Sequence, residues 1–444
     1  MKTKLTFITF ILNLVAIAAF SQAQEVVLSL DEALRLAKQN NKTLQVQYME
    51  EKVAAGSVKE ARSAMLPSIS AHGNYAYYFN RQVIFMPGSF AGNENEPVVD
   101  VAVGGRNTVS TNVYLQQAIV NESARNQIRS SKLEAAIQSQ RTRGLEGDMV
   151  VRISENYFNI QLLQASIELH QQSLERNNRA LKDSRALYLQ GKALKVDTLR
   201  NCIEVENLKS TVSYLSNRLE VHLLQLKNDL GISASTSISV TDSLSIDSNW
   251  VISTADEEQL LNRPDLQEGK LSVSLYKNYL EQSRAQRLPM LSLIGSYQLQ
   301  AQADDLKFNA YNWPKTSLIG LQASVPIFTG NKINARISQS NWRLKQSQSI
   351  LEQLHDNART EKAMLENDLQ ESIKQVSIQQ RTVEAASLSY RMIRDRYQNG
   401  LSSRIELADA ELALTQAKLD QLQAVYMVRL TKLKYDRALG LLTF

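Results

Sequence analysis

Residues 287–300 read RLPMLSLIGSYQLQ, and this stretch changes abruptly from one periodicity to another. The polar, helix-like run before it ends at Leu288-Pro289, because a proline pushes the preceding residue out of the α-helical region. Strict alternation then begins, with apolar residues on one face and polar residues on the other: Leu291, Leu293, Tyr297 and Leu299 against Ser292, Ser296, Gln298 and Gln300. A period of two predicts a β-strand. Residues 65–77, MLPSISAHGNYAY, make nearly the same transition.

These two transitions belong to an internal repeat. Six residues recur at a constant shift of 222 (289 − 67): Arg62, Leu66, Pro67, Ser70, Gly73 and Tyr75 become Arg284, Leu288, Pro289, Ser292, Gly295 and Tyr297. Five more recur at a shift of 209 (400 − 191): Arg185, Tyr188, Gly191, Leu230 and Gly231 become Arg394, Tyr397, Gly400, Leu439 and Gly440. Because the identities fall in gap-free registers, we interpret the chain as two copies of one plan.

The predicted division of the chain begins with a secretory signal peptide at residues 1–23. Lys2 and Lys4 precede an apolar run, and Ser21-Gln22-Ala23 offers a cleavage site of the small-x-small type. The first structural repeat is predicted at 24–232, an inter-repeat linker at 233–253, and the second repeat at 254–444.

Each repeat is predicted to contain two shorter helices and two strands that lead into two long helices. The strands are expected at about 68–80, 107–119, 290–300 and 316–328, and the long helices at about 121–190, 195–230, 331–399 and 405–439. Ser29-Leu-Asp-Glu32 forms a capping box for the first short helix. Gly144 and Gly147 fall inside the first long helix, where glycine favours a bend or an interruption.

Composition argues against an enzyme. The 444 residues carry a formal net charge of +5 with both signs interspersed, so no basic stripe for nucleic acid is present. The single cysteine, Cys202, excludes an intrachain disulfide framework, and the four histidines show no spacing typical of a metal site. Neither a phosphate-binding loop nor a recognisable nucleophile motif occurs. We predict no catalytic site, no cofactor, no metal and no nucleic-acid partner.

The four strands have the pattern of an outer-membrane β-barrel, apolar toward lipid and polar toward a wet lumen. A half-buried soluble sheet shows the same alternation, and the strands alone do not separate the two. The secretory signal and the Leu-Pro junctions favour the barrel. Because such barrels need about eight strands or more, the edges of a four-stranded sheet must pair between chains. The pattern therefore predicts an oligomer without fixing the number of chains.

The long helices carry narrow apolar strips on otherwise polar surfaces. One strip comprises Met149, Val150, Ile153, Tyr157 and Ile160, at helical spacing. Helices of about 70 residues, near 100 Å in length, must pack side by side as coiled coils. A solid bundle is one arrangement, and a hollow one better explains the extensive polar but weakly charged surface.

The combination resembles the TolC family of outer-membrane efflux proteins over nearly the whole mature chain. The resemblance rests on the duplicated order, on Leu-Pro at the helix-to-strand junctions, on VPIF-x-G at 325–330 and on Tyr-x-x-Gly at the helix turns. It implies a mixed α and β membrane protein: a trimer whose 12-stranded β-barrel continues into a periplasmic α-helical coiled-coil barrel. It also implies a periplasmic adaptor and an inner-membrane transporter as partners.

Site residues follow from the same resemblance. Gly191 and Gly400, with Tyr188 and Tyr397, match the tunnel-tip turns that meet the adaptor. Asp197, Tyr397, Glu406 and Asp409 match the periplasmic gate, and Arg404 is assigned to the gate with them. Where the family pattern has Arg two residues after the second glycine, this chain has Ser402, with Arg404 two further on. Pro67, Pro289, Ala118 and Pro326 mark the helix–strand junctions, and Ala118 departs from the proline of the second copy.

The predicted function is a passive exit duct in the outer membrane, extending into the periplasm, that conducts small molecules delivered by a pump and adaptor. Two alternatives remain open at this point. The duct could instead export polypeptides as part of a type I secretion system, because the pump selects the cargo. A secreted coiled-coil structural or adaptor protein is the alternative from a different class.

Overall fold

The computed structural model describes residues 26–444 except 93–94, 242–243, 245–256, 308–309 and 443. The predicted signal peptide therefore lies outside the described residues, as does much of the predicted linker. The chain divides into two compact units. One unit comprises Lys52–Gln138 and Lys270–Ile350, and the other comprises the described residues of Met1–Glu51, Ser139–Gly269 and Leu351–Phe444.

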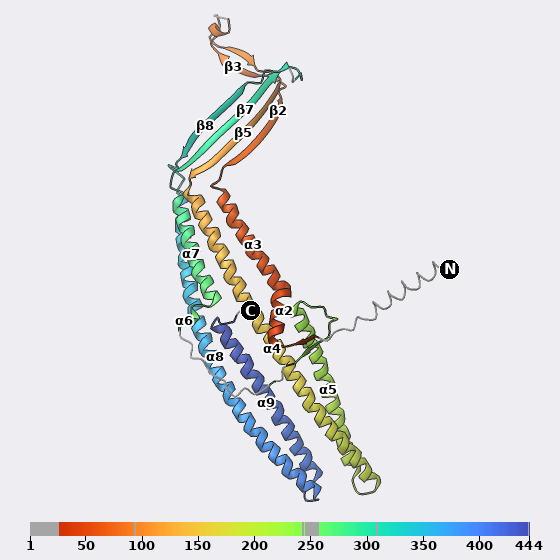
Figure 1. Cartoon of the computed structure of the whole chain (residues 1–444). Helices are drawn as coiled ribbons and strands as arrows, with labels where there is room; N and C mark the ends of the chain where they lie inside the picture. The colour runs from red at the N-terminus through yellow and green to blue at the C-terminus, as the bar shows by residue number, and fades with distance from the viewer. Residues whose placement is uncertain (1–25, 93–94, 242–243, 245–256, 308–309, 443) are drawn as a thin grey trace, which may run out of the picture. The chain divides into compact units, whose positions relative to one another are not determined.

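The first of these units contains a four-stranded antiparallel sheet in the order β2-β5-β7-β8 (Figure 1). The strands are β2 (Ser68–Tyr77), β5 (Asn107–Val120), β7 (Met290–Ala303) and β8 (Lys315–Ser324). Within the described residues, neither outer edge, β2 or β8, has a strand partner. Helices lead into and out of this sheet: α3 (Lys42–Ser63), α4 (Glu122–Leu189), α7 (Pro264–Ala285) and α8 (Lys332–Gln398).

The two Leu-Pro junctions have the same local geometry. After α3, the Leu66 amide donates to the Ser63 carbonyl at 2.9 Å, and β2 begins directly after Pro67. After α7, the Leu288 amide donates to the Ala285 carbonyl at 3.0 Å, and β7 begins directly after Pro289. At each junction the helix ends four residues before the proline, at Ser63 or Ala285, and the strand begins directly after the proline.

The strand ends differ from the prediction in three places. The strand expected at 316–328 is wrong in its last four residues, because β8 ends at Ser324 opposite Met290, the first residue of β7. Beyond that point Pro326 has no amide to donate to a ladder. The strand expected at 68–80 ends at Tyr77, and β7 continues to Ala303 instead of 300. At Ala118 the β5 register shifts, since Ala118 pairs with Ser292 and Val120 with Leu291.

The sequence pattern did not predict two further strand pairs. Within the sheet-containing unit, β3 (Gln82–Met86) and β4 (Val99–Val103) form an antiparallel ribbon. In the other unit, β1 (Val26–Leu28) pairs in parallel with β6 (Ile238–Val240), which lies inside the predicted linker. Strands of three residues carry too little periodicity to be recognised from sequence.

The helical unit contains α2 (Leu30–Asn40), α5 (Lys195–Leu230), α6 (Glu257–Leu260) and α9 (Arg404–Ala438), together with most of α4 and α8. The capping box is present: the Glu32 amide donates to Ser29 Oγ at 3.3 Å, and the Ser29 amide donates to Glu32 Oε2 at 3.0 Å. Helix α4 runs without interruption through Gly144 and Gly147, so the expected break there is absent.

The predicted apolar strip of α4 lies at the centre of the core of this unit. Met149, Ile153, Tyr157 and Ile160 are all buried. The Tyr157 hydroxyl donates to the Leu28 carbonyl at 3.0 Å, which ties α4 to β1. The strip thus packs one side of α4 into this core, as its helical spacing predicts.

Candidate functional site

The four-stranded sheet has one apolar and one polar face. Directly paired residues of antiparallel strands share a face, so the register aligns apolar residues across all four strands. The apolar rows include Ile69–Leu115–Gly295–Ile319 and Gln117–Leu293–Leu321. Ile319 and Leu321 remain 79% and 64% exposed in the single chain. An apolar face of this extent requires a covering phase such as lipid.

The opposite face is polar. Its rows include Ser68–Gln116, His72–Asn112–Gln298–Thr316 and Ala118–Ser292–Gln322. The Ser296 hydroxyl donates to Asn112 Oδ1 at 2.9 Å on this face. The alternation predicted from residues 287–300 therefore extends over most of the sheet, with amide and hydroxyl groups on the side away from the apolar surface. Ile294 and Leu318 are exceptions, because the register places them on the polar face.

The turn that joins α4 to α5 and the turn that joins α8 to α9 have the same geometry. In the first turn, the Gly191 amide donates to the Tyr188 carbonyl and the Lys192 amide to the Leu187 carbonyl, both at 2.9 Å. In the second, Gly400 donates to the Tyr397 carbonyl at 3.0 Å and Leu401 to the Arg396 carbonyl at 2.9 Å. Both glycines have φ of +72°, the left-handed conformation that ends a helix in a Schellman motif.

A cleft of about 410 Å³ lies between these helix ends. Residues of α4, α5, α8 and α9 line it, among them Asp197, Tyr397 and Arg404. The structure thus brings together three of the five predicted gate residues. Tyr188 is exposed at the first turn and does not line the cleft.

Glu406 and Asp409 lie outside this cleft, exposed and one turn apart on α9. The Glu406 carboxylate accepts a hydrogen bond from the Ser402 hydroxyl. The backbone amide of Glu406 donates to Ser403 Oγ at 3.2 Å. The hydrogen bond from Ser402 holds the pKa of Glu406 below its ordinary value. Ser402, which replaces the family arginine, therefore stabilises the charged carboxylate by hydrogen bonding. Among the described residues, no carboxylate forms an ion pair with Arg404.

A second charge cluster at the cleft is absent from the sequence prediction. The Glu411 side chain is only 11% exposed, and its Oε1 atom lies 3.8 Å from Arg176 Nε. The Tyr390 hydroxyl donates to the same oxygen at 3.4 Å. Burial raises the pKa of Tyr390, and the Glu411 charge adds to the effect. This cluster joins α4, α8 and α9. The only local signal for it is an acid among the alanines and leucines of α9.

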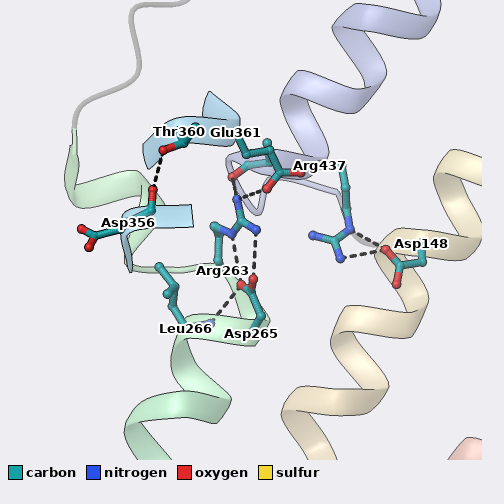
Figure 2. Close-up of polar contacts among 9 residues, drawn as sticks. Asp148, Arg263, Asp265, Leu266, Asp356, Thr360, Glu361 and Arg437 are labelled. Atoms are coloured by element: carbon teal, nitrogen blue, oxygen red, sulfur yellow. Dashed lines mark hydrogen bonds and ion pairs between the residues drawn. The ribbon is translucent and has the colours of Figure 1, made fainter. Parts of the chain in front are cut away.

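Arg263, also in the helical unit, is the most buried charged side chain among the ion pairs of the described residues, and it contacts two carboxylates (Figure 2). Its side chain is 7% exposed and contacts Asp265 through Nε at 3.0 Å and Nη2 at 2.9 Å. Nη1 donates to Glu361 Oε2 at 2.7 Å and to the Ala438 carbonyl at 3.1 Å. Burial opposes the charge on Arg263, but the two carboxylates outweigh it and raise the pKa of Arg263. The start of α7 is thereby joined to α8 and to the end of α9.

The C-terminal end of α9 is also joined to the middle of α4 by a polar contact. Arg437 of α9 contacts Asp148 of α4, with Nη2 at 2.7 Å and Nε at 2.8 Å from Oδ1 (Figure 2).

Among the described residues, no group of three or more His, Cys, Asp or Glu side chains is placed to hold a metal ion. No helix in the described part of the chain has the length and apolar character to cross a bilayer.

A sheet with one lipid-compatible face, carried on long polar helices, defines a channel protein of the outer membrane. The chain belongs to the outer membrane efflux protein family, whose sequence profile matches residues 33–231 and 257–441. It is an outer-membrane protein that extends into the periplasm. The family consists of efflux ducts, not of enzymes.

Three relatives illustrate the match. The alkaline protease secretion protein AprF of Pseudomonas aeruginosa is 23% identical over 74% of this chain and 66% of its own length. The cation efflux system protein CusC of Escherichia coli K12 is 24% identical over 66% of this chain and 64% of its own length. TolC of the same organism is 20% identical over 97% of this chain and 85% of its own length.

The chain thus spans slightly less than two thirds of AprF and CusC, although the structural match is wider. A solved structure of CusC superposes with a TM-score of 0.75 at 19% identity, covering 93% of this chain and 92% of that one. At such identity the likeness shows the fold. The family match, by contrast, places the chain among the outer membrane efflux proteins, against the alternative of a secreted coiled-coil protein.

Proposed function

We propose that the protein is the outer-membrane exit duct of a tripartite efflux system and works as a homotrimer. The observation that carries this proposal is the open sheet, whose β2 and β8 edges have no strand partner within the described residues. An unpaired edge in lipid leaves backbone groups unsatisfied, at a cost of several kcal/mol each. If β8 of one chain pairs with β2 of the next, three chains close a barrel of 12 strands and leave no edge.

The direction of the apolar face supports the same arrangement. Ile69, Leu115, Leu293 and Ile319 would face the lipid, and Ser296, Gln298 and Asn112 would line a wet lumen. Beyond the membrane, the long helices of three chains would form a hollow coiled-coil tunnel in the periplasm. Their burial is limited to narrow strips such as Met149 to Ile160, which leaves polar surface for a water-filled interior.

The internal repeat accounts for the order of elements in this arrangement. Repeats at 24–232 and 254–444, joined by the linker at 233–253, would each supply two strands and two long helices. Pro67 and Pro289 would mark entry into the membrane, and Ala118 and Pro326 the return to the periplasm.

The helix turns are proposed to contact the adaptor and to close the tunnel. Gly191 and Gly400, with Tyr188 and Tyr397 beside them, form the two exposed tips that an adaptor would meet. In the proposed gate, Asp197, Tyr397 and Arg404 lie at the cleft, while Glu406 and Asp409 would form acidic rings under threefold symmetry. Like charges repeated about an axis repel one another or bind cations.

The proposal is tested in planar lipid bilayers and by extraction in mild detergent. Stable trimers and discrete conductance steps are expected. A matched control is the double variant Ile69→Lys and Ile319→Lys, which places charges on the apolar face and should abolish both signals. A stable monomer, or a wild-type protein that extracts intact and never conducts, would contradict the duct.

Cargo is the second part of the proposal. We favour small molecules, because the relatives include a cation efflux protein, and we carry polypeptide export as the second candidate because AprF is a secretion protein. Identification of the co-purifying inner-membrane transporter separates them: a proton-driven pump supports small-molecule efflux, and an ATP-driven export system supports secretion.

A further inference from the structure

The β3–β4 ribbon exposes large apolar side chains outside the four-stranded sheet. It leaves the sheet between β2 and β5, within the sheet-containing unit (Figure 1). Phe85 on β3 is 74% exposed, and Phe90 in the short helix after β3 is 83% exposed. An isolated two-stranded ribbon is at best marginally stable in water, so this one requires a covering surface.

Apolar side chains occupy both faces of the ribbon. The register pairs Ile84 with Val101 and Met86 with Val99, so these four residues share the first face. Val83 and Phe85 lie on the second face, opposite Ala102 and Asp100. A lipid surface or one peripheral protein would cover a single face and leave the other in water.

The base of the ribbon is held to the sheet by polar contacts. Asp304, at the end of β7, forms an ion pair with Arg81 and accepts a hydrogen bond from the Arg106 amide at 3.2 Å. The Tyr78 amide donates to the Arg106 carbonyl at 2.7 Å. The Asp304 carboxylate thus holds the chain on both sides of the ribbon, at Arg81 before β3 and at Arg106 after β4.

The position of the ribbon indicates what covers it. β3 follows β2 in the chain, and β2 is the edge strand that pairs with β8 of the neighbouring chain in the proposed trimer. In a cyclic trimer each contact is heterologous, so every chain uses one patch toward the preceding neighbour and a different patch toward the following one. Two apolar faces on one element at the edge between chains meet that requirement.

We propose that the three ribbons of a trimer pack on one another and form a collar above the barrel. The first face of each ribbon, defined by Ile84, Met86, Val99 and Val101, contacts the second face of the next, defined by Val83 and Phe85. The partner is therefore a second copy of this chain. The inference rests on the proposed trimeric duct and adds a second contact between chains, outside the barrel.

Cysteine cross-linking on intact cells tests the collar. In a Cys202→Ser background, the double variant Phe85→Cys and Val101→Cys places one thiol on each face. Opposite faces prevent a disulfide within one ribbon, because the two Cβ atoms point apart. Oxidation should convert the monomer band to a covalent trimer in denaturing gels. Each single variant can give at most a covalent dimer, and the same-face pair Val83→Cys and Phe85→Cys should give no trimer.

A spin label at Phe85→Cys provides a readout that does not depend on disulfide geometry. In the collar, the label is shielded from both water-soluble and lipid-soluble relaxation agents. Exposure to oxygen from the lipid would overturn the collar in favour of the membrane, and exposure to the aqueous agent would overturn it in favour of free ribbons.

The outcome for the collar is separable from the outcome for the duct. Detergent-stable, conducting trimers without a covalent trimer band and without shielding of the label would refute the collar alone. A wild-type protein that forms neither stable trimers nor conducting channels would instead refute the proposed duct, and the collar with it.

Discussion

Arg263 and Glu361 lie 98 residues apart in the chain, yet Arg263 Nη1 donates to Glu361 Oε2 at 2.7 Å inside the helical unit. The same guanidinium binds Asp265 and the Ala438 carbonyl, so one side chain joins α7, α8 and α9. A charge that is taken out of water in this way must keep all its partners, because an unpaired buried charge is strongly destabilising.

Replacement of Arg263 by Met should destabilise the helical unit by about 1–3 kcal/mol, since Asp265 and Glu361 are themselves partly exposed and recover some hydration. The measurement is thermal unfolding followed by the helical circular-dichroism signal. The control is Lys374→Met, which removes an exposed contact to Glu371 at 3.8 Å and should cost about 0–1 kcal/mol. Equal shifts for both variants would contradict a special role for Arg263.

The pH dependence of stability should report the partner, Asp265. Burial opposes its ionisation, but the hydrogen bonds and charge of Arg263 outweigh burial and hold the pKa of Asp265 below its ordinary value. A depressed pKa contributes stability that is present above the unfolded value of about 3.9 and is lost as pH falls through the folded value. Asp265→Asn should therefore flatten the acid limb of the stability curve. An acid limb as steep as that of the wild type would place the titrating group elsewhere.

Adjacent residues of β8 provide a matched test of the sheet faces. Leu321 lies in an apolar row and Gln322 in a polar row. Leu321→Lys should cost about 2–4 kcal/mol in a bilayer, because the charge would face hydrocarbon, whereas Gln322→Lys should fold normally. Urea unfolding in lipid vesicles measures the difference. Similar losses for the two variants would argue for a sheet that is buried on both faces.

The helix turns should depend on glycine. Gly400 has φ of +72°, where a Cβ costs about 1–2 kcal/mol, so Gly400→Ala should loosen the turn and increase amide exchange there. Gly56 is the control: it lies within α3 with open space around it, and Gly56→Ala should stabilise by about 0.5–1 kcal/mol. Unchanged exchange at Gly400→Ala would show that the turn tolerates another conformation.

Cation block should depend on the two exposed acids of α9. If Glu406 and Asp409 form rings near the axis, their replacement by Ala should weaken block of the conductance by divalent or trivalent cations by roughly tenfold, the equivalent of about 1.4 kcal/mol. Glu281→Ala, which removes an exposed acid on α7 that pairs with Arg284, should leave block unchanged. Unaltered block in the double variant would make these acids ordinary first-turn residues of a helix.

Short-range features of this fold are determined by sequence alone. Proline at Pro67 and Pro289 ends a helix through local sterics, and alternation over residues 287–300 orients a strand whatever lies beside it. The spacing of Met149, Ile153 and Tyr157 fixes the buried side of α4, and the glycines at 191 and 400 permit left-handed turns that few other residues adopt. These effects act over a few residues, so a pattern suffices to predict them.

Other features are decided only by the tertiary structure. Glu361 and the Ala438 carbonyl, which bind Arg263, and Arg176 and Tyr390, which contact Glu411, come from other helices, and their identity depends on how those helices pack. The end of β8 at Ser324 follows from where its partner strand, β7, begins. The β1–β6 pair joins two strands that are too short to be predicted from periodicity. In each case the free energy comes from contacts between segments far apart in the chain, whose geometry no local periodicity specifies.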